Sequence, residues 1–494
     1  MPQQAIVIGA GFSGLAAACV LAQEGLQVSV LEQHDQVGGR ARVFKKDGFT
    51  FDMGPSWYWM PDVMEQFFQR FGSSPSTYFH LKRLDPSYQI YFSDGSTMKV
   101  PASFSELKQL FEQEEAGAGH QLELFLADAR IKYETGIGEF VQKPSLSLFE
   151  YMEPSLLKSA FQLNLFHSFA KHVRGYFRSP KLLQLLEFPV LFLGAMPEKI
   201  PALYSMMNYA DIKLGTWYPD GGFGKLAEGM FQLAKSLGVT FHFQTTVENL
   251  EVYNKQISSV KTSKGVFNAD VVISSADYHF TETQLLPSHL RNYSDTYWER
   301  RVMSPSCLLY YIGVKKKVKK LQHHNLFFDA DFDRHAKAIY NQPQYPEKPL
   351  YYVCCPSKTD PSVAPEGMEN LFILIPVAPG LDDSTAMRNH YYQHVLQRLE
   401  EYCGEAIADH VVTCTPYALQ NFKDDYNAFK GNAYGLANTL MQTAFLKPKM
   451  RNKKVHNLFY TGQLTVPGPG VPPSIISGQL VADYIVKNFK TQAS

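Results

Sequence analysis

The first forty residues alternate between short apolar runs and glycine-rich interruptions. The run AIVI at residues 5–8 has the length of a buried strand, and Leu15–Gln23 has the length of a helix. A second apolar run, VSVL at residues 28–31, ends at Glu32. This order predicts a strand, a helix and a second strand, the unit from which doubly wound α/β domains are built.

Glycines separate the first strand from the helix. Gly9, Gly11 and Gly14 have the spacing that permits a tight turn, the approach of a pyrophosphate, and close helix packing. The helix amino terminus offers free N–H groups to phosphates, and Glu32 is placed to accept hydrogen bonds from a ribose. A second glycine pair with arginines follows in QHDQVGGRAR. We therefore expect one dinucleotide site, formed by Gly9, Ala10, Gly11, Phe12, Ser13, Gly14, Glu32, Gln33, Gly38, Gly39, Arg40, Ala41 and Arg42.

The middle of the chain changes to strand-like patterns. Residues 88–101 alternate about an Asp-Gly turn, which predicts a hairpin, and residues 247–276 predict a meander that returns to a buried strand. Between residues 281 and 445, apolar runs such as CLLYYIGV, PLYYVCC and NLFILIPV indicate a mixed sheet.

The closing stretch TGQLTVPGPGVPPSIISG, residues 461–478, combines glycines and prolines directly before a helix-like run. Pro472 and Pro473 suit the first turn of a helix, where a missing N–H costs little. Glycines let the backbone lie flat against a ligand. The apolar positions of the following helix predict that it docks on a sheet.

The charge balance and the cysteine positions exclude several classes of function. Lys plus Arg and Asp plus Glu both number 47, so no global basic field favours a nucleic-acid partner. The six cysteines lack CxxC spacing, which argues against a zinc site and a disulfide framework. Cys354 and Cys355 are interpreted as small apolar residues of a buried strand. His323 and His324 follow the basic run KKKVKK, interpreted as a solvated strand end, and we expect no metal site.

Localisation depends on two segments. The uncharged run at residues 5–22 lacks the basic flank of a signal peptide, so the expected compartment is the cytoplasm. Residues 155–186 carry no acidic residue and are basic and apolar, which favours peripheral attachment to anionic membranes; the alternative is a helical lid. The basic positions are Lys158, Lys171, Arg174, Arg178 and Lys181.

Several motifs together resemble a known group of flavoproteins. The opening IVIGAGFSGLAAACVLAQEGLQVSVLEQHDQVGGRARVF is similar to that of amine oxidases and protoporphyrinogen oxidase. The resemblance narrows to the bacterial phytoene-type carotenoid desaturases at FTFDMGPSWYWMPDV, GTWYPDGGFGKLAEGM, NADVVISSADYHF and TGQLTVPGPGVPPSIISGQLVAD. It spans the whole chain, and its last motif is more specific than its first.

The resemblance implies non-covalent FAD and an α/β fold with a Rossmann-like FAD-binding domain. It adds to the cofactor site Gly54, Pro55, Ser56, Val247, Gly462, Gly470, Val471 and Pro472. The expected division is a discontinuous FAD-binding domain, a mixed-sheet substrate domain, and a helical subdomain that acts as a lid or associates with membranes. The FAD-binding domain comprises residues 1–75, 215–280 and 446–494. The substrate domain comprises residues 76–105 and 281–445, and the helical subdomain comprises residues 106–214.

The implied reaction removes a hydride and a proton from CH2–CH2 units of a long acyclic carotenoid. FAD would accept the hydride, and oxygen or a quinone would reoxidise it. Trp57, Tyr58 and Trp59 are candidates for an aromatic lining that stabilises an allylic cation, or they only pack. No carboxylate can be named as the proton acceptor, so the catalytic residues stay unknown.

The substrate could be phytoene, a C30 analogue or a later hydroxylated carotenoid. A cis–trans isomerase that uses reduced FAD and a prenyl-binding carrier of the same fold are alternatives. An amine oxidase with a covalent flavin is disfavoured, because no cysteine follows Cys414.

Overall fold

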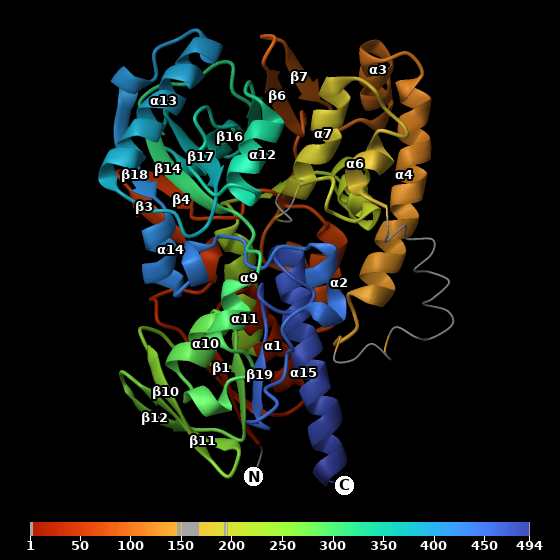
Figure 1. Cartoon of the computed structure of the whole chain (residues 1–494). Coiled ribbons are helices and arrows are strands. Elements are labelled where there is room, and N and C mark those ends of the chain that lie inside the picture. Colours follow the sequence, from red (N-terminus) through yellow and green to blue (C-terminus); the bar gives the residue numbers. More distant parts are fainter. Residues whose placement is uncertain (1–2, 146–149, 151–166, 192–193, 195, 494) are drawn as a thin grey trace.

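The computed structural model describes residues 3–145, 150, 167–191, 194 and 196–493. Two large sheets lie toward opposite ends of the molecule, with both termini beside the lower one (Figure 1). None of the helices within the described ranges is long and apolar enough to cross a membrane.

The lower sheet is parallel throughout and has five strands. Their order is β19 (Leu458–Tyr460), β13 (Val271–Ser274), β1 (Gln4–Ile8), β2 (Gln27–Leu31) and β9 (Thr240–His242). The strand–helix–strand unit predicted at the amino terminus is confirmed as β1, α1 (Phe12–Gln23) and β2. Beside it, the predicted meander forms β10 (Val247–Tyr253), β11 (Gln256–Thr262) and β12 (Gly265–Asn268).

The final helix, α15 (Val471–Ala493), packs against α1 (Figure 1). It also reaches the lower sheet, as predicted, because the ring of Tyr484 lies 6.1 Å from that of Phe459 on β19, between centroids. A Cβ added to Gly478 would lie 2.2 Å from the carbonyl oxygen of Ser13, so the two backbones touch at this point. Ala16, Ala17 and Ala18 on α1 are buried, and their small side chains allow the two helices to lie close together. The apolar face of α15 therefore covers a part of α1 that is formed by small residues.

The upper sheet has seven strands and is mixed, as predicted. The order is β18 (Val411–Tyr417), β14 (Ser306–Val314), β17 (Glu369–Val377), β16 (Tyr351–Cys354), β15 (His324–Phe328), β6 (Tyr88–Phe92) and β7 (Thr97–Val100). Only β15 and β6 pair in parallel within this sheet of described strands.

Alternation along β14 gives the upper sheet two apolar faces. Leu308 and Tyr310 belong to the core beneath α13 (Thr385–Cys403), whereas Leu309 belongs to the core that continues toward the lower sheet. The face carrying Leu309 is thereby directed at the space between the sheets.

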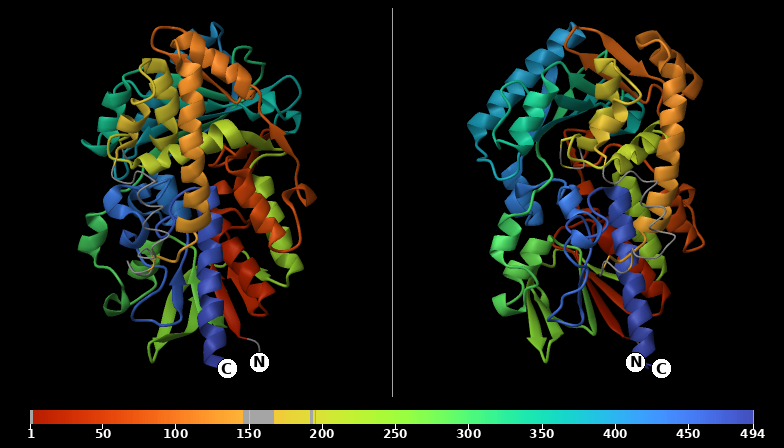
Figure 2. Two further views of the ribbon diagram at one scale, coloured as in Figure 1. Left: turned by 90° about the vertical axis from the view of Figure 1, so that its right-hand side faces the viewer. Right: turned by 45° about the vertical axis from the view of Figure 1, so that its right-hand side comes forward.

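A group of helices lies beside β6 and β7 at one end of the upper sheet (Figure 1). They are α3 (Phe104–Glu114), α4 (Ala118–Thr135), α6 (Phe169–Val173), α7 (Pro180–Leu191) and α8 (Met206–Tyr209). Helix α4, the long orange helix, runs along the molecule (Figure 2). Other α-helices within the described residues are α2 (Pro61–Gln69), α9 (Gly224–Ser236), α10 (Tyr278–Gln284), α11 (Asp295–Glu299), α12 (Phe332–Tyr340) and α14 (Leu419–Tyr426). Two small ribbons pair β3 (Val43–Lys46) with β4 (Phe49–Asp52), and β5 (Leu81–Arg83) with β8 (Trp217–Pro219).

Only residues 167–186 of the basic segment 155–186 are among those the structure describes, and two of their basic side chains form ion pairs. Arg174 pairs with Glu187 at 2.7 Å, and Lys181 pairs with Asp94 at 2.8 Å. Lys171 and Arg178 are exposed, and Lys158 lies outside the described residues.

Candidate functional site

A cavity of about 440 Å³ extends from the carboxyl ends of the lower sheet to the inner face of the upper sheet. It brings together segments from both termini and from the centre of the chain. The predicted residues that line it are Gly9, Gly11, Phe12, Ser13, Glu32, Gln33, Gly38, Gly39, Arg40, Ala41, Gly54, Pro55, Ser56, Trp57, Trp59, Val247, Gly462, Gly470, Val471 and Pro472. Ala10, Gly14, Arg42 and Tyr58 are outside this lining.

The first glycine loop forms a cradle at the end of β1. A Cβ on Gly14 would lie 2.1 Å from the carbonyl oxygen of Gly9, so Gly14 permits the close turn although it does not face the cavity. At Gly11, the nearest atom to an added Cβ is the Ser275 hydroxyl at 4.0 Å, so the space there is open to a ligand. The loop thus has a tight inner side and a vacant outer side, which fits the approach of a phosphate.

Glu32 lies at the end of β2 and ties the loops together. Its carboxylate accepts hydrogen bonds from the backbone N–H groups of Ala10 (2.7 Å) and His34 (2.9 Å). A carboxylate has about four lone-pair positions, so acceptor capacity remains for a ribose hydroxyl.

The two arginines of the second loop have different surroundings. Arg42 forms an ion pair with Asp425 at 2.6 Å. Arg40 lines the cavity, and its Nε has no hydrogen-bond partner among the described residues. Burial lowers the pKa of Arg40, while the nearby charge of Asp277 acts in the opposite direction. The half-buried Arg40 side chain, with an unused donor beside the open glycine cradle, fits a pyrophosphate anion.

The closing loop reaches the same cavity from the other end of the chain. Gly462 and Gly470 have φ of +102° and +116°, a region that favours glycine. The N–H of Gly462 donates to the Ser477 hydroxyl at 3.0 Å, which fixes the loop to α15. The helix starts at Val471 with Pro472 and Pro473 in its first turn, as the sequence predicted.

Aromatic side chains form the opposite end of the cavity. The ring of Trp57 lies 5.2 Å from Trp59 and 5.4 Å from Tyr88, between centroids. Trp59 donates through Nε1 to the Thr216 hydroxyl at 2.8 Å, which fixes its indole. Trp57 and Trp59 both line the cavity. Their role in stabilising an allylic cation stays a prediction.

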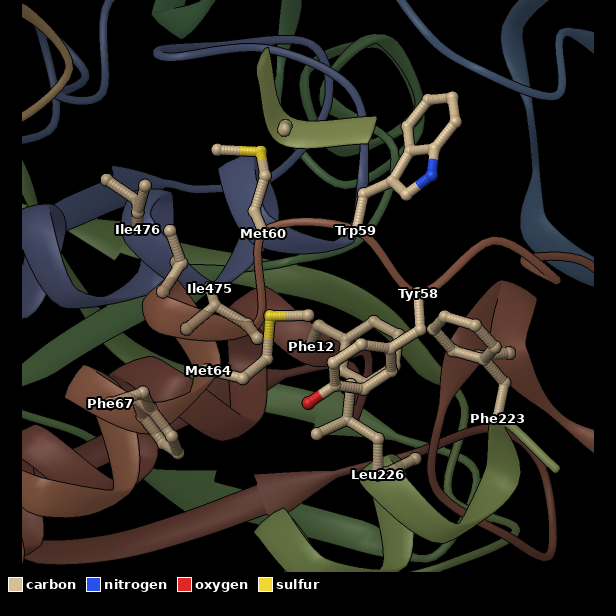
Figure 3. Packing of buried hydrophobic residues seen from close by; sticks show 14 of the residues in the cluster. Phe12, Tyr58, Trp59, Met60, Met64, Phe67, Phe223, Leu226, Ile475 and Ile476 are labelled. Carbon is tan, nitrogen blue, oxygen red and sulfur yellow. The ribbon is translucent and has the colours of Figure 1, made fainter. Parts of the chain in front are cut away.

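Tyr58 does not share this position. Its ring lies 5.6 Å from Phe223 and 6.4 Å from Phe79. Figure 3 shows Tyr58 and Trp59 leaving the same loop in different directions. Tyr58 is fully buried, which corresponds to the packing role left open for it.

The fold also brings Cys354 close to His323 and His324, although these residues are about 30 positions apart in the sequence. His323 and His324 are buried, not part of a solvated basic cluster. Strand β16 places Cys354 opposite His324, and one ligand-type atom from each of the three residues lies within 4.8 Å of the others. Spacing along the chain could not reveal this cluster; two histidines opening the apolar run HHNLFF were the available signal.

The geometry defines a dinucleotide-binding fold joined to an apolar chamber. Residues 12–486 match the family of flavin-containing amine oxidoreductases. The chain belongs to this family and is an FAD-dependent oxidoreductase.

Relatives are similar over almost the full length. The chain is 42% identical to a carotenoid 3,4-desaturase of Haloarcula japonica over 98% of each chain. It is 30% identical to a zeta-carotene-forming phytoene desaturase of Myxococcus xanthus, covering 97% of this chain and 93% of that one. A putrescine oxidase variant aligns over 99% of both chains with a TM-score of 0.65 and 14% identity, which shows a shared fold.

Proposed function

We propose that this protein is a carotenoid desaturase, which converts CH2–CH2 units of a long acyclic carotenoid to CH=CH. The observation that carries the proposal is that one continuous cavity is lined by the nucleotide-type glycine loops and by apolar side chains. The apolar part includes Met60, Met64, Ile137, Val141, Leu309 and Leu374. The relatives named carotenoid desaturases support the same conclusion.

The cofactor half of the cavity would hold FAD, which when bound supplies a two-electron acceptor. We propose that the Gly9–Gly14 loop and Arg40 bind its pyrophosphate, and that Glu32 binds its ribose. Gly38, Gly39, Val247 and the Gly54–Ser56 segment would surround it. Gly462, Gly470, Val471 and Pro472 would lie against the flavin, where the start of α15 favours negative charge.

The other half would hold the polyene. Loss of a hydride leaves an allylic cation, which aromatic faces stabilise. Trp57 and Trp59 present such faces on the cavity wall. We propose that the two tryptophans orient the polyene and exclude water. The parallel sheet would hold the cofactor, the mixed sheet would hold the substrate, and the helices would cover the substrate.

For the substrate within the carotenoids, we propose a late carotenoid. The 42% identity to a 3,4-desaturase favours a late carotenoid over phytoene. Flavin bleaching under anaerobic conditions tests this choice, with liposomes that contain either phytoene or an acyclic hydroxylated carotenoid. Bleaching by neither, with a change in polyene geometry, would instead indicate an isomerase. Oxygen or a quinone would reoxidise the flavin.

Carotenoids dissolve in bilayers, so we also propose peripheral attachment to the membrane from the cytoplasmic side. The exposed Lys171 and Arg178 and the exposed apolar side chains of Met441 (71%) and Leu446 (37%) support it. Co-flotation with anionic liposomes, absent with neutral ones, is the expected result. Failure to co-float with anionic liposomes would contradict the proposal.

A further inference from the structure

The proposed reaction releases a proton inside a closed chamber. One carbon of the CH2–CH2 unit loses a hydrogen with both bonding electrons to the flavin, and its neighbour loses a proton. That proton, next to a cation, is strongly acidic, so a weak base suffices and position decides which group accepts it. The following inference rests on the proposed function and concerns where this proton goes.

A hydrogen-bonded group begins at the cavity wall. Tyr352 and Ser56 both line the large cavity, and their hydroxyls are 2.9 Å apart. The Tyr352 hydroxyl also lies 2.6 Å from Nδ1 of His324. His324 is fully buried, and its Nε2 has no hydrogen-bond partner in the described part of the chain. A proton received by Tyr352 can therefore be passed to His324 while the phenol stays neutral.

A second histidine continues the path. The rings of His323 and His324 have centroids 4.5 Å apart. His323 Nδ1 is 2.7 Å from the Thr359 hydroxyl, and its Nε2 is also unpartnered among described residues. The separation of up to 4.8 Å between atoms of the two histidines is the span of one bridging water, with two hydrogen bonds of about 2.8 Å.

Two further cavities lie along this line. A small one of about 20 Å³ is lined by Ser56 and His323 and has room for a single water. A wider one of about 390 Å³ is lined by His323, Thr359 and the exposed side chains of Lys82 and Asp85. His323 borders both, so it separates the interior from a cavity that reaches the surface.

We propose that Tyr352, His324, His323 and Thr359 form a proton exit path from the large cavity to the surface. The Tyr352 hydroxyl relays the proton to His324, which is the first group to hold it as a cation, and Thr359 passes the proton to water beside Lys82. The stacking of His324 on Trp57 holds its ring in register with Tyr352.

The surroundings of the histidines suit transient protonation. Burial lowers the pKa of His323 to about 3, against the opposing charge of Asp360, and lowers that of His324 well below its usual value. Tyr218 packs on His323, and Cys354 lies opposite His324 with a thiol whose pKa burial raises to about 12. Both imidazoles are therefore neutral at rest and release a proton readily once they have accepted it.

Stopped-flow measurements on the FAD-loaded protein test the path. Carotenoid-loaded liposomes are mixed anaerobically in weak buffer, and flavin bleaching and proton release to a pH indicator are followed together. In the wild type, both signals should share one time course. Thr359→Val should delay proton release behind bleaching by at least about 10-fold, and so should His324→Phe, which keeps a ring against Trp57. This minimum is set below the contribution of about 100-fold that a positioned acid or base makes at the low end.

Matched controls separate this effect from general damage. Thr413 is a buried threonine with an unpartnered hydroxyl, and His394 has an unpartnered Nε2 on α13, both among described residues and outside the large cavity's lining. Thr413→Val and His394→Phe should show no delay. In His323→Ala, imidazole entering from the surface cavity should restore proton release, which a purely structural role would not allow.

The outcomes are distinct. Proton release that keeps pace with bleaching in Thr359→Val and His323→Ala would overturn the path and leave the desaturase proposal standing. A stoichiometric metal ion held at His323, His324 and Cys354 would also overturn it. Absence of bleaching in the wild type would overturn the proposed function and with it the source of the proton.

Discussion

The indole ring of Trp57 stacks on the imidazole ring of His324, with centroids 4.1 Å apart and an angle of 11° between the planes. Trp57 follows the loop that lines the cofactor half of the cavity, and His324 begins β15 of the mixed sheet. The contact therefore joins the two halves where the polyene would meet the flavin.

Replacing Trp57 by leucine should slow flavin reduction without loss of FAD. A cation–π contact contributes about 0.5–2 kcal/mol, which corresponds to about 2- to 30-fold in rate. Trp57→Phe keeps an aromatic face and should retain more of the rate. Anaerobic bleaching measures the rate, and the visible absorbance of the bound flavin in the purified variant measures FAD retention. An unchanged bleaching rate in Trp57→Leu would remove the proposed role.

Glu32→Ala should weaken FAD binding. Hydrogen bonds to a charged group contribute about 1.5–3 kcal/mol, so Kd should rise about 10- to 150-fold. Asp35→Ala is the matched control, because Asp35 is exposed and close in sequence. Titration of the deflavinated variants with FAD gives both values. Equal affinity of Glu32→Ala and wild type would show that Glu32 does not bind the ribose.

Gly478→Ala should destabilise the fold through the contact between α15 and α1. The added Cβ would lie 2.2 Å from the Ser13 carbonyl oxygen, and overpacking of this kind costs about 1–3 kcal/mol. Gly138→Ala, where the added Cβ meets nothing within 4 Å, is the control. Thermal unfolding should show a lowered Tm for Gly478→Ala alone; an equal Tm in both variants would argue against the close contact.

Lys447 should make stability depend on pH. It is 2% exposed, and its Nζ has no hydrogen-bond partner among the described residues; burial lowers its pKa to about 7. Between that pKa and the ordinary value of 10.5, the unfolded chain binds more protons, so this group makes stability rise with pH. Lys447→Met should therefore raise Tm more at pH 6 than at pH 9. A larger rise in Tm at pH 9 than at pH 6 would contradict a lowered pKa of Lys447.

Much of the cofactor site could be predicted because its signals are local. The turn at Gly9 and Gly14, the acid at the end of β2, and the loop before α15 are each set by a few adjacent residues. Their conformations depend on backbone freedom and hydrogen-bonding capacity, which short sequence stretches encode.

Other features depend on contacts between distant segments. Arg42 pairs with Asp425, which lies 383 positions away, so the sequence could not separate its role from that of Arg40. Strand pairing sets Cys354 beside His324, and loop direction buries Tyr58 while Trp59 faces the cavity. Docking of α15 on α1 likewise follows from the small residues on both helices, not from the apolar pattern of α15 alone.

The most direct test of the account is the anaerobic flavin spectrum of the purified protein mixed with carotenoid-loaded liposomes. We predict bleaching of the bound FAD together with a red-shifted polyene band, because each new double bond extends conjugation and reduces one flavin. An FAD-loaded protein whose flavin stays oxidised with every acyclic carotenoid offered, and whose polyene spectra do not change, would contradict the account.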